Sequence, residues 1–338
     1  MNCDDRNDRN RFASSVSIRN MMLLMLCCLT TILQAADIRV VAGNGEAGFV
    51  DGSDARLNKP IRLAPFGPGR ILVADFNNHA IRSVTLDGEV VTIAGGPGKR
   101  GHKDGPAAQA GFDGPHGVSV SADGLIAVAG ASSHTVRLLT PANDGYQVTT
   151  LAGVVGESGF NDGPAAEALF NSPHAVVWEA DGGVLVVDIG NASIRRVKDG
   201  MVTTVATAAD SNFVMPIDMM AAGDRGYLIA DAGIQKALRW SPGDQGEILA
   251  AKTEMAMPHG VAGDADGNIY VAEIRGHQVT ELVAGVTAKR IAGTGTAGAG
   301  PDQLDKPAGV LVHDGYVWIA DLNNHRIVAV SLESLEHR

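Results

Sequence analysis

"ILVADFNNHAIRSV", residues 71–84, and "VWIADLNNHRIVAV", residues 317–330, are two versions of one pattern at opposite ends of the chain. Each joins two short apolar segments through a turn that contains an acidic residue, two asparagines and a histidine. Short runs rich in Val, Ile and Ala that are bounded by Asn and Asp are typical of β-strands joined by a tight turn. A unit that recurs in this way predicts a repeat architecture.

Six copies of a longer unit align on the proline that opens each of them. These prolines are Pro60, Pro115, Pro173, Pro216, Pro258 and Pro307. The position that ends the second apolar segment is acidic in five copies and Gly130 in the second copy. It follows the proline by 15 residues in five copies and by 14 in one. A third segment and a fourth, which usually ends in Ala-Gly, complete the unit. Four short strands repeated six times predict an all-β fold, a six-bladed β-propeller.

The last unit is incomplete, because only "SLESLEHR" follows its third segment. The missing strand has a counterpart at the other end of the chain, where "IRVVAG", residues 38–43, matches the fourth segments "VVTIAG" and "VTTLAG". We therefore expect the N-terminal strand to complete the last blade. Closure of this kind removes an unpaired sheet edge.

The two quoted segments resemble NHL repeats, which are named for an Asn-His-Leu-type triplet, and the resemblance covers residues 38–330. It implies a propeller but little about activity, because one fold hosts many functions. The fourth unit, "YLIADAGIQKALRW", departs most from the pattern, since it lacks the Asn-His pair.

Residues 1–36 read as a signal peptide, and residues 37–338 as the propeller. Arginines precede a 13-residue apolar run, residues 21–33, and small residues follow it. We expect a secreted, periplasmic or cell-envelope protein with no membrane span in the mature chain, because a span needs about 20 apolar residues. The alternative is a membrane anchor formed by an uncleaved signal. All three cysteines, Cys3, Cys27 and Cys28, lie in this leader, so no disulfide is expected in the mature chain.

Composition narrows the function only slightly. The formal net charge of −11 makes a nucleic-acid partner unexpected. The sequence contains no G-x-S-x-G elbow, P-loop or H-E-x-x-H motif. Whether the protein is an enzyme is left open by these observations.

The histidines fall into two classes. Those of the first class follow the acidic position by four residues, and we expect them to stabilise the turn between the second and third strands: His79, His134, His277 and His325. Those of the second class directly follow the opening proline: His116, His174 and His259. The equivalent positions in the other three units are Ile61, Ile217 and Ala308.

The second class supplies the candidate site. First strands line the channel of a propeller, so His116, His174 and His259 should meet at one channel mouth, where they could contact a ligand. They could instead bind a divalent metal such as zinc, which imidazole suits. This pattern resembles the propeller of peptidylglycine amidating lyases, whose metal-binding histidines also follow proline at strand starts. In those lyases the ligands come from alternating blades, whereas here they come from the second, third and fifth. The third possibility is that each histidine only bonds a neighbouring backbone group.

Long connections lead to the same mouth. Three of them carry a sub-motif: "GFVDGSDARLNKP", "GHKDGPAAQAGFDGP" and "GFNDGPAAEALFNSP". Their carboxylates, among them Asp51, Asp54, Asp104 and Asp162, leave calcium open as a cofactor, although no EF-hand spacing is present. Because long loops on a rigid scaffold often carry function, the leading hypothesis is an exported module that binds a protein, peptide or glycan through this long-loop face. The alternative is a metal-dependent lyase or hydrolase with its histidines at the channel mouth. A protein that only braces a larger assembly is indistinguishable from the first.

Overall fold

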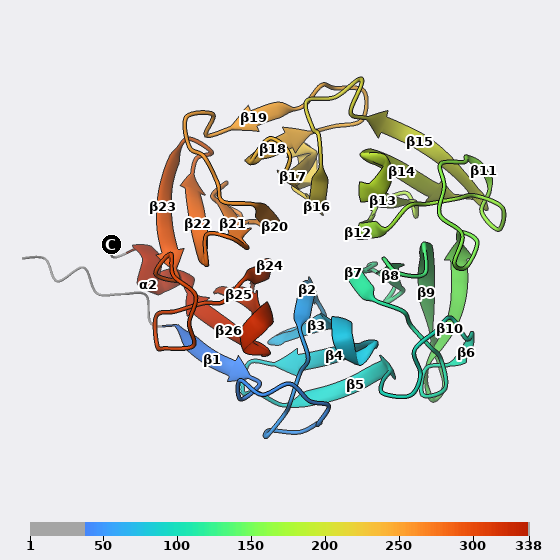
Figure 1. Ribbon diagram of the computed structural model, residues 1–338, viewed down its shortest axis with the longest axis horizontal. Coiled ribbons are helices and arrows are strands. Elements are labelled where there is room, and N and C mark those ends of the chain that lie inside the picture. Colours follow the sequence, from blue (N-terminus) through green and yellow to red (C-terminus); the bar gives the residue numbers. More distant parts are fainter. Residues whose placement is uncertain (1–37, 337–338) are drawn as a thin grey trace, which may run out of the picture. The chain divides into compact units, whose positions relative to one another are not determined.

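Residues 38–336 are described by the computed structural model. They form six antiparallel sheets arranged as blades around one axis (Figure 1). The predicted six-bladed β-propeller is confirmed. Blade 1 consists of β2 (Pro60–Pro65), β3 (Arg70–Asp75), β4 (Ala80–Thr85) and β5 (Val90–Gly95). Blade 2 consists of β7 (Pro115–Val120), β8 (Ile126–Gly130), β9 (Thr135–Ala142) and β10 (Gly145–Ala152), with the short β6 (Gly105–Pro106) on its edge.

The remaining blades follow the same order. Blade 3 consists of β12 (Pro173–Trp178), β13 (Val184–Asp188), β14 (Ser193–Lys198) and β15 (Met201–Thr207), with β11 (Gly163–Pro164) on its edge. Blade 4 consists of β16 (Pro216–Ala221), β17 (Tyr227–Asp231), β18 (Lys236–Trp240) and β19 (Glu247–Leu249). Blade 5 consists of β20 (Pro258–Gly263), β21 (Ile269–Glu273), β22 (Gln278–Val283) and β23 (Thr287–Ala292). Blade 6 contains β24 (Pro307–His313), β25 (Tyr316–Asp321) and β26 (Arg326–Ser331), followed by the helix α2 (Leu332–Glu336).

The N-terminal strand closes the ring. Strand β1 (Arg39–Ala42) pairs antiparallel with β26, with Arg39 opposite Ala329 and Val40 opposite Val328. The predicted closure of the last blade is therefore confirmed. The predicted signal peptide and its cleavage site lie outside the described residues. Between residues 38 and 336 there is no helix with the length and apolar character of a membrane span.

The core is divided into six clusters, each between two neighbouring blades. Leu72 of blade 1, for example, shares a cluster with Val128 of blade 2 and with Phe112 of the loop that precedes blade 2. The cluster that joins the last blade to the first contains Trp318 and Val73. Because each blade buries its apolar faces against both neighbours, its stability depends on the closed ring.

The Asn-His turn connects neighbouring blades. His79 has φ 53°, directly after the 3₁₀ turn η1 (Phe76–Asn78), and its Nδ1 accepts the backbone N–H of Gly114 in blade 2 at 3.4 Å. Three equivalent bonds have nitrogen-to-nitrogen distances of 3.0–3.2 Å: His134 with Ser172, His277 with Lys306, and His325 with Lys59. These histidines act across the blade interface, beyond the expected role within the turn.

Blade 4 lacks this connection on both sides. At the equivalent turn position, blade 3 has Ala192 at its interface with blade 4, and blade 4 has Gln235 at its interface with blade 5. Neither can offer an imidazole nitrogen to the next blade, so two of the six interfaces have no histidine link.

Candidate functional site

The structure brings the three Pro-His histidines together. His116, His174 and His259 follow the first residue of β7, β12 and β20. The ring centroids of His116 and His174 are 3.9 Å apart, and those of His116 and His259 are 5.6 Å apart. We call this group the histidine mouth. It forms because a fixed repeat position becomes a ring of neighbours once the blades close.

Each ring of the histidine mouth is held by a backbone carbonyl. The Nδ1 of His116 donates to His174 O at 3.1 Å, and that of His174 donates to Ser172 O at 2.8 Å. The Nδ1 of His259 donates to Ala308 O at 2.9 Å. A carbonyl oxygen can only accept, so each Nδ1 carries the proton, and in a neutral ring Nε2 keeps the lone pair. Within residues 38–336, no Nε2 of the three rings makes a hydrogen bond. The backbone bonds foreseen from the sequence are therefore present, and one nitrogen per ring is left over.

The rings are neutral near pH 7. Burial, with the nearby Arg62 cation, lowers the pKa of His174 to about 4 and that of His259 to about 3. Burial and the neighbouring His174 lower the pKa of His116 well below its usual value. His116 is 4% and His259 7% exposed, so the mouth is drier than a solvent-filled channel entrance.

An ion pair crosses the channel directly below the histidines. Arg62 and Asp218 each lie two residues after the opening proline, on blades 1 and 4, and Arg62 Nε is 3.0 Å from Asp218 Oδ1. Arg62 also donates to His259 O at 2.9 Å and to Ile217 O at 3.0 Å. Asp218 accepts the backbone N–H of Val261 at 2.9 Å. This pair was missed by the sequence reasoning, although the same alignment of prolines places both charges at one repeat position.

The geometry of the histidine mouth does not match a preformed metal site. Among the described residues, no group of three or more His, Cys, Asp or Glu side chains is arranged to hold a metal ion. Each Nδ1 is engaged by a carbonyl, and the rings of His116 and His174 lie tilted against each other at 49°.

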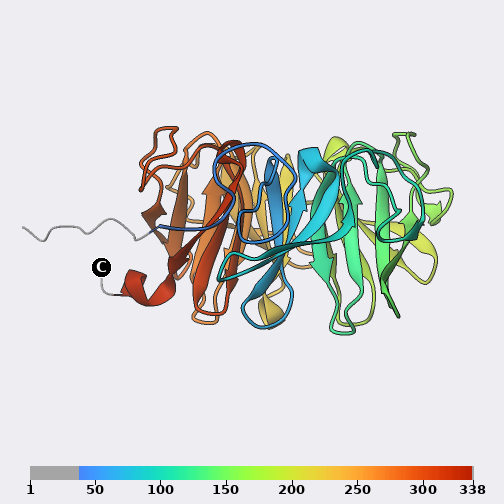
Figure 2. The ribbon, with the colours of Figure 1, turned by 90° about the horizontal axis from the view of Figure 1, so that it is seen from below.

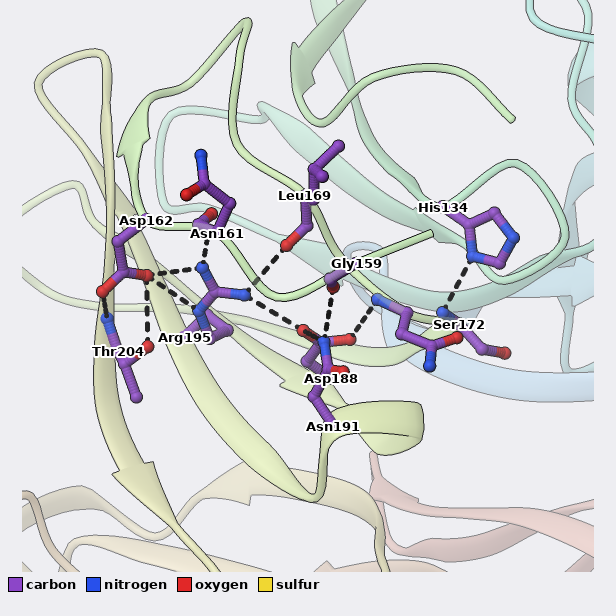
Figure 3. Close-up of polar contacts among 11 residues, drawn as sticks. His134, Gly159, Asn161, Asp162, Leu169, Ser172, Asp188, Asn191, Arg195 and Thr204 are labelled. Carbon is purple, nitrogen blue, oxygen red and sulfur yellow. Dashed lines mark hydrogen bonds and ion pairs between the residues drawn. The ribbon is translucent and has the colours of Figure 1, made fainter. Parts of the chain in front are cut away.

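The loop aspartates bind arginines. Figure 3 shows Arg195 of β14 between Asp162 of the preceding long loop and Asp188 of β13, at 3.1 Å from each for the Nε and Nη1 atoms. Arg195 also donates to the loop carbonyl of Leu169, and Asp162 accepts the N–H and hydroxyl of Thr204 in β15. The buried guanidinium thus fastens the long loop to the blade. We call this arrangement the loop clamp.

Blades 1 and 2 contain the same contact between a loop aspartate and a strand arginine, although blade 2 has Gly130 in place of the strand aspartate. The sets are Asp51 with Arg82 and Thr92, and Asp104 with Arg137 and Thr150. Three of the four aspartates considered for calcium are therefore already paired with arginine. The fourth, Asp54, is exposed.

The long loops surround four adjacent blades. Loops 43–59, 96–114, 153–172 and 293–306 precede blades 1, 2, 3 and 6, whereas the short connections 208–215 and 250–257 precede blades 4 and 5. Figure 2 shows the loops of this face along the upper rim. Four large apolar side chains are exposed on these connections: Val50 at 41%, Phe160 at 54%, Val214 at 56% and Met215 at 36%. The long-loop face thus combines clamped loops, exposed apolar groups and the histidine mouth.

The sequence is similar to those of several known proteins. No family model matches it. NHL repeat-containing protein 2 of Bos taurus is 26% identical over 343 residues, covering 90% of this chain and 44% of that protein. NHL repeat-containing protein 3 of Homo sapiens is 28% identical over 219 residues, covering 62% of this chain and 60% of that protein. Both relatives are named for NHL repeats, the repeat type that this sequence resembles.

The chain is an NHL-repeat β-propeller. This NHL-repeat propeller is also 25% identical over 315 residues to Protein SUPPRESSOR OF QUENCHING 1, chloroplastic, of Arabidopsis thaliana, covering 79% of this chain and 30% of that protein. It spans between 30% and 60% of the length of these three relatives.

Solved structures share the fold at low identity. A Bacteroides thetaiotaomicron protein of unknown function matches with a TM-score of 0.65 at 19% identity, covering 88% of this chain and 76% of that one. An auxiliary nutrient binding protein from the same bacterium matches with a TM-score of 0.65 at 14% identity, covering 87% and 76%. A streptogramin B lyase matches with a TM-score of 0.58 at 15% identity, covering 87% and 97%. At such identities the similarity concerns the fold alone.

Proposed function

We propose that this NHL-repeat propeller is an exported binding module that holds a protein, peptide or glycan on its long-loop face. The observation that carries the proposal is the histidine mouth: three neutral rings keep Nε2 without a hydrogen bond inside residues 38–336, at the centre of a face built from clamped loops. Nitrogens with a lone pair accept hydrogen bonds from hydroxyl or amide groups of a ligand.

The loop clamps support binding over a purely structural role. A loop that is fixed before the ligand arrives loses little conformational entropy on binding. The buried guanidiniums of Arg82, Arg137 and Arg195 fix three long loops in this way. Phe160, which stands over Arg195 with its ring centroid 4.8 Å from the guanidinium carbon, is an exposed aromatic anchor on the same face.

The class of ligand follows from the surface. With a formal net charge of −11, the protein offers little to nucleic acid. One solved neighbour that shares the fold is named an auxiliary nutrient binding protein, and this supports the proposal. We therefore place protein, peptide and glycan ligands ahead of nucleic acid.

The second candidate is a metal-dependent lyase or hydrolase that uses the same three histidines. It is favoured by the clustering of three imidazoles, and the solved neighbours include a streptogramin B lyase. One observation counts against it. Among residues 38–336, no group of three or more His, Cys, Asp or Glu side chains is arranged to hold a metal ion.

The experiment is a paired binding screen. The full chain, labelled with a fluorophore, is applied to immobilised peptide and glycan arrays, together with His174→Ala and the matched control His313→Ala. His313 ends β24, at the opposite end of the strand from the histidine mouth. Ligands of the proposed site should lose at least tenfold in affinity with His174→Ala and stay unchanged with His313→Ala. A ligand that is insensitive to His174→Ala would contradict this assignment.

Two measurements address the remaining parts of the proposal. Elemental analysis of the purified protein should find no stoichiometric transition metal, and one zinc per chain would favour the lyase or hydrolase. Mass spectrometry of the exported protein should find a chain that begins near Ala36 or Asp37. Retention of Cys27 or Cys28 would replace export with anchoring in the membrane.

A further inference from the structure

A cavity of about 250 Å³ lies between blades 4 and 5. Its wall includes the last residues of β16 and β20, at the ends of these strands that point away from the histidine mouth. Apolar side chains of both blades form part of the wall, among them Met220, Leu228 and Ile269. Arg225 and Arg239 of blade 4 also line it. We call it the inter-blade cavity.

The corresponding place between blades 3 and 4 is filled by an ion pair. Arg196 of β14 is bound by both carboxylate oxygens of Glu179, with Arg196 Nε 2.6 Å from Glu179 Oε2. Glu179 lies six residues after Pro173, and its N–H closes the turn after β12 by donating to Gly183 O. Tyr227 of blade 4 lies beside the pair. In blade 3, the arginine at this strand position is thus paired with a carboxylate of its own blade.

Blade 4 keeps this arginine and lacks the carboxylate. Arg239 follows the acidic position of its blade by eight residues, as Arg196 does in blade 3. The repeat position of Glu179 is taken by Ala222, whose N–H closes the same kind of turn. In blade 5, the smaller Ile269 stands at the repeat position of the tyrosine. By repeat position, the inter-blade cavity therefore lies where blade 3 has its carboxylate.

The two arginines of the inter-blade cavity have hydrogen-bond donors to spare. Arg239 Nη1 donates to Glu247 at 3.1 Å, and the Glu247 side chain is 64% exposed. Arg239 Nε is buried, but within residues 38–336 its Nη2 is neither buried nor hydrogen-bonded, and the whole side chain is 30% exposed. Arg225 is exposed, and it donates from Nη2 to the backbone oxygen of Asp264 at 3.4 Å. A ligand can therefore reach Nη2 of Arg239 and the Arg225 guanidinium.

Neighbouring carboxylates limit the charge that a ligand can carry. Asp264 also lines the cavity, but its carboxylate accepts the Asn268 N–H and the Tyr270 hydroxyl. Asp244 and Glu247 line an adjoining hollow, to which both arginines also belong. These carboxylates repel a dianion more strongly than a monoanion. A singly charged ligand is therefore favoured over a phosphate dianion.

We propose that the inter-blade cavity binds a small monocarboxylate with an apolar body. Its carboxylate pairs with Arg239 Nη2 and with Arg225, because guanidinium groups bind carboxylates through charge-assisted hydrogen bonds. Its apolar body packs against Leu228 and Ile269. A cavity of about 150 Å³ already holds benzene, so the inter-blade cavity has room for a molecule of the size of benzoate. This site is separate from the ligand site proposed for the long-loop face.

The first test compares two probes of similar shape, benzoate and benzamide, of which only benzoate is charged at neutral pH. Isothermal titration calorimetry with the full chain measures both affinities at low salt. Benzoate should bind about tenfold more tightly than benzamide or better, and added salt should weaken benzoate alone. Inorganic phosphate, titrated in the same way, should bind more weakly than benzoate.

Variants locate the site. Arg239→Gln should weaken benzoate about tenfold or more. Ala222→Glu supplies the carboxylate that blade 3 has, so it should block benzoate to a similar extent, and Ala222→Gln, which has nearly the same size without the charge, should weaken it less. The control is Arg70→Gln, which changes an exposed arginine at the start of β3 in blade 1 and should leave the affinity unchanged.

Several results would overturn the proposal. They are no binding of benzoate, equal affinities for benzoate and benzamide, phosphate binding as tight as that of benzoate, and unchanged benzoate binding by Arg239→Gln or Ala222→Glu. No residue of the histidine mouth lines the inter-blade cavity, so none of these results decides the proposed function.

Discussion

The Arg62 guanidinium lies 3.0 Å from the Asp218 carboxylate, and this ion pair links blade 1 to blade 4 on the opposite side of the ring. The bonds of Arg62 to Ile217 O and His259 O extend the link to blades 4 and 5. Burial raises the pKa of Asp218, while the Arg62 cation opposes that rise. The pair therefore lies next to the histidine mouth and connects opposite blades at the centre of the ring.

Removal of one charge of this pair should destabilise the ring. Arg62→Met leaves Asp218 buried without its partner, and we expect a loss of about 3–5 kcal/mol in the free energy of unfolding. The double variant Arg62→Met with Asp218→Leu should recover part of that loss, because no isolated charge then remains. Urea unfolding followed by circular dichroism measures both. A single variant as stable as the unaltered protein would show that the pair does not brace the ring.

The histidine link between blades should contribute to stability. His325→Ala removes the acceptor of the Lys59 N–H at the interface between the last blade and the first, and should cost about 1–3 kcal/mol. The matched control is His102→Ala, an exposed histidine on a long loop, which should cost little. Equal unfolding midpoints for the two variants would rule out the link. Hydrogen exchange should also be fastest around blade 4, which lacks the link on both sides.

Acid should destabilise the protein through the histidine mouth. An unfolded histidine binds a proton near pH 6.5, whereas in the folded protein the pKa of His174 is lowered to about 4 and that of His259 to about 3. Between pH 6.5 and the folded pKa values, the unfolded state binds more protons than the folded state. The contribution of these neutral rings to the free energy of unfolding is therefore complete above pH 6.5 and is lost as the pH falls toward 4. The carboxylates titrate in the same range. The measured quantity is therefore the difference in urea midpoint between the unaltered protein and the double variant His174→Gln, His259→Gln, from pH 8 to 4.5. That difference should shrink with acid, and a constant difference would contradict the neutral, buried state of these rings.

The loop clamps should govern access to the long loops. Asp162→Ala removes the acceptor of Arg195 and Thr204, so loop 153–172 should become sensitive to limited proteolysis. Asp54→Ala changes an exposed aspartate on another long loop and serves as the control. Calcium should protect neither variant from proteolysis, because the loop is held by the guanidinium of Arg195. If calcium protected the unaltered protein from proteolysis, that result would instead support calcium binding by these aspartates.

Much of the fold followed from repeat spacing. A proline, an acidic position and an Asn-His turn at fixed intervals assign each segment to a strand, and the "IRVVAG" segment then has one vacant place, beside β26. The meeting of His116, His174 and His259 followed from the same symmetry, since one repeat position maps to one ring of neighbours.

Contacts between opposite blades, and contacts between a loop and a later strand, were beyond that reasoning. The Arg62–Asp218 pair depends on blades 1 and 4 facing each other across the channel. The clamp between Asp162 and Arg195 joins a loop to a strand 33 residues later, where the arginine resembles an ordinary outward-facing residue of a strand. The burial of His116 and His259, which are 4% and 7% exposed, was also beyond that reasoning, because it depends on how closely the first strands pack around the channel.

The central claim is that the histidine mouth contacts the ligand of the long-loop face. The most direct measurement is the paired array screen, with the affinity of each peptide or glycan hit determined for the unaltered chain, His174→Ala and His313→Ala. The account predicts at least a tenfold loss with His174→Ala and no change with His313→Ala. Hits that bind the unaltered chain and His174→Ala equally would contradict it.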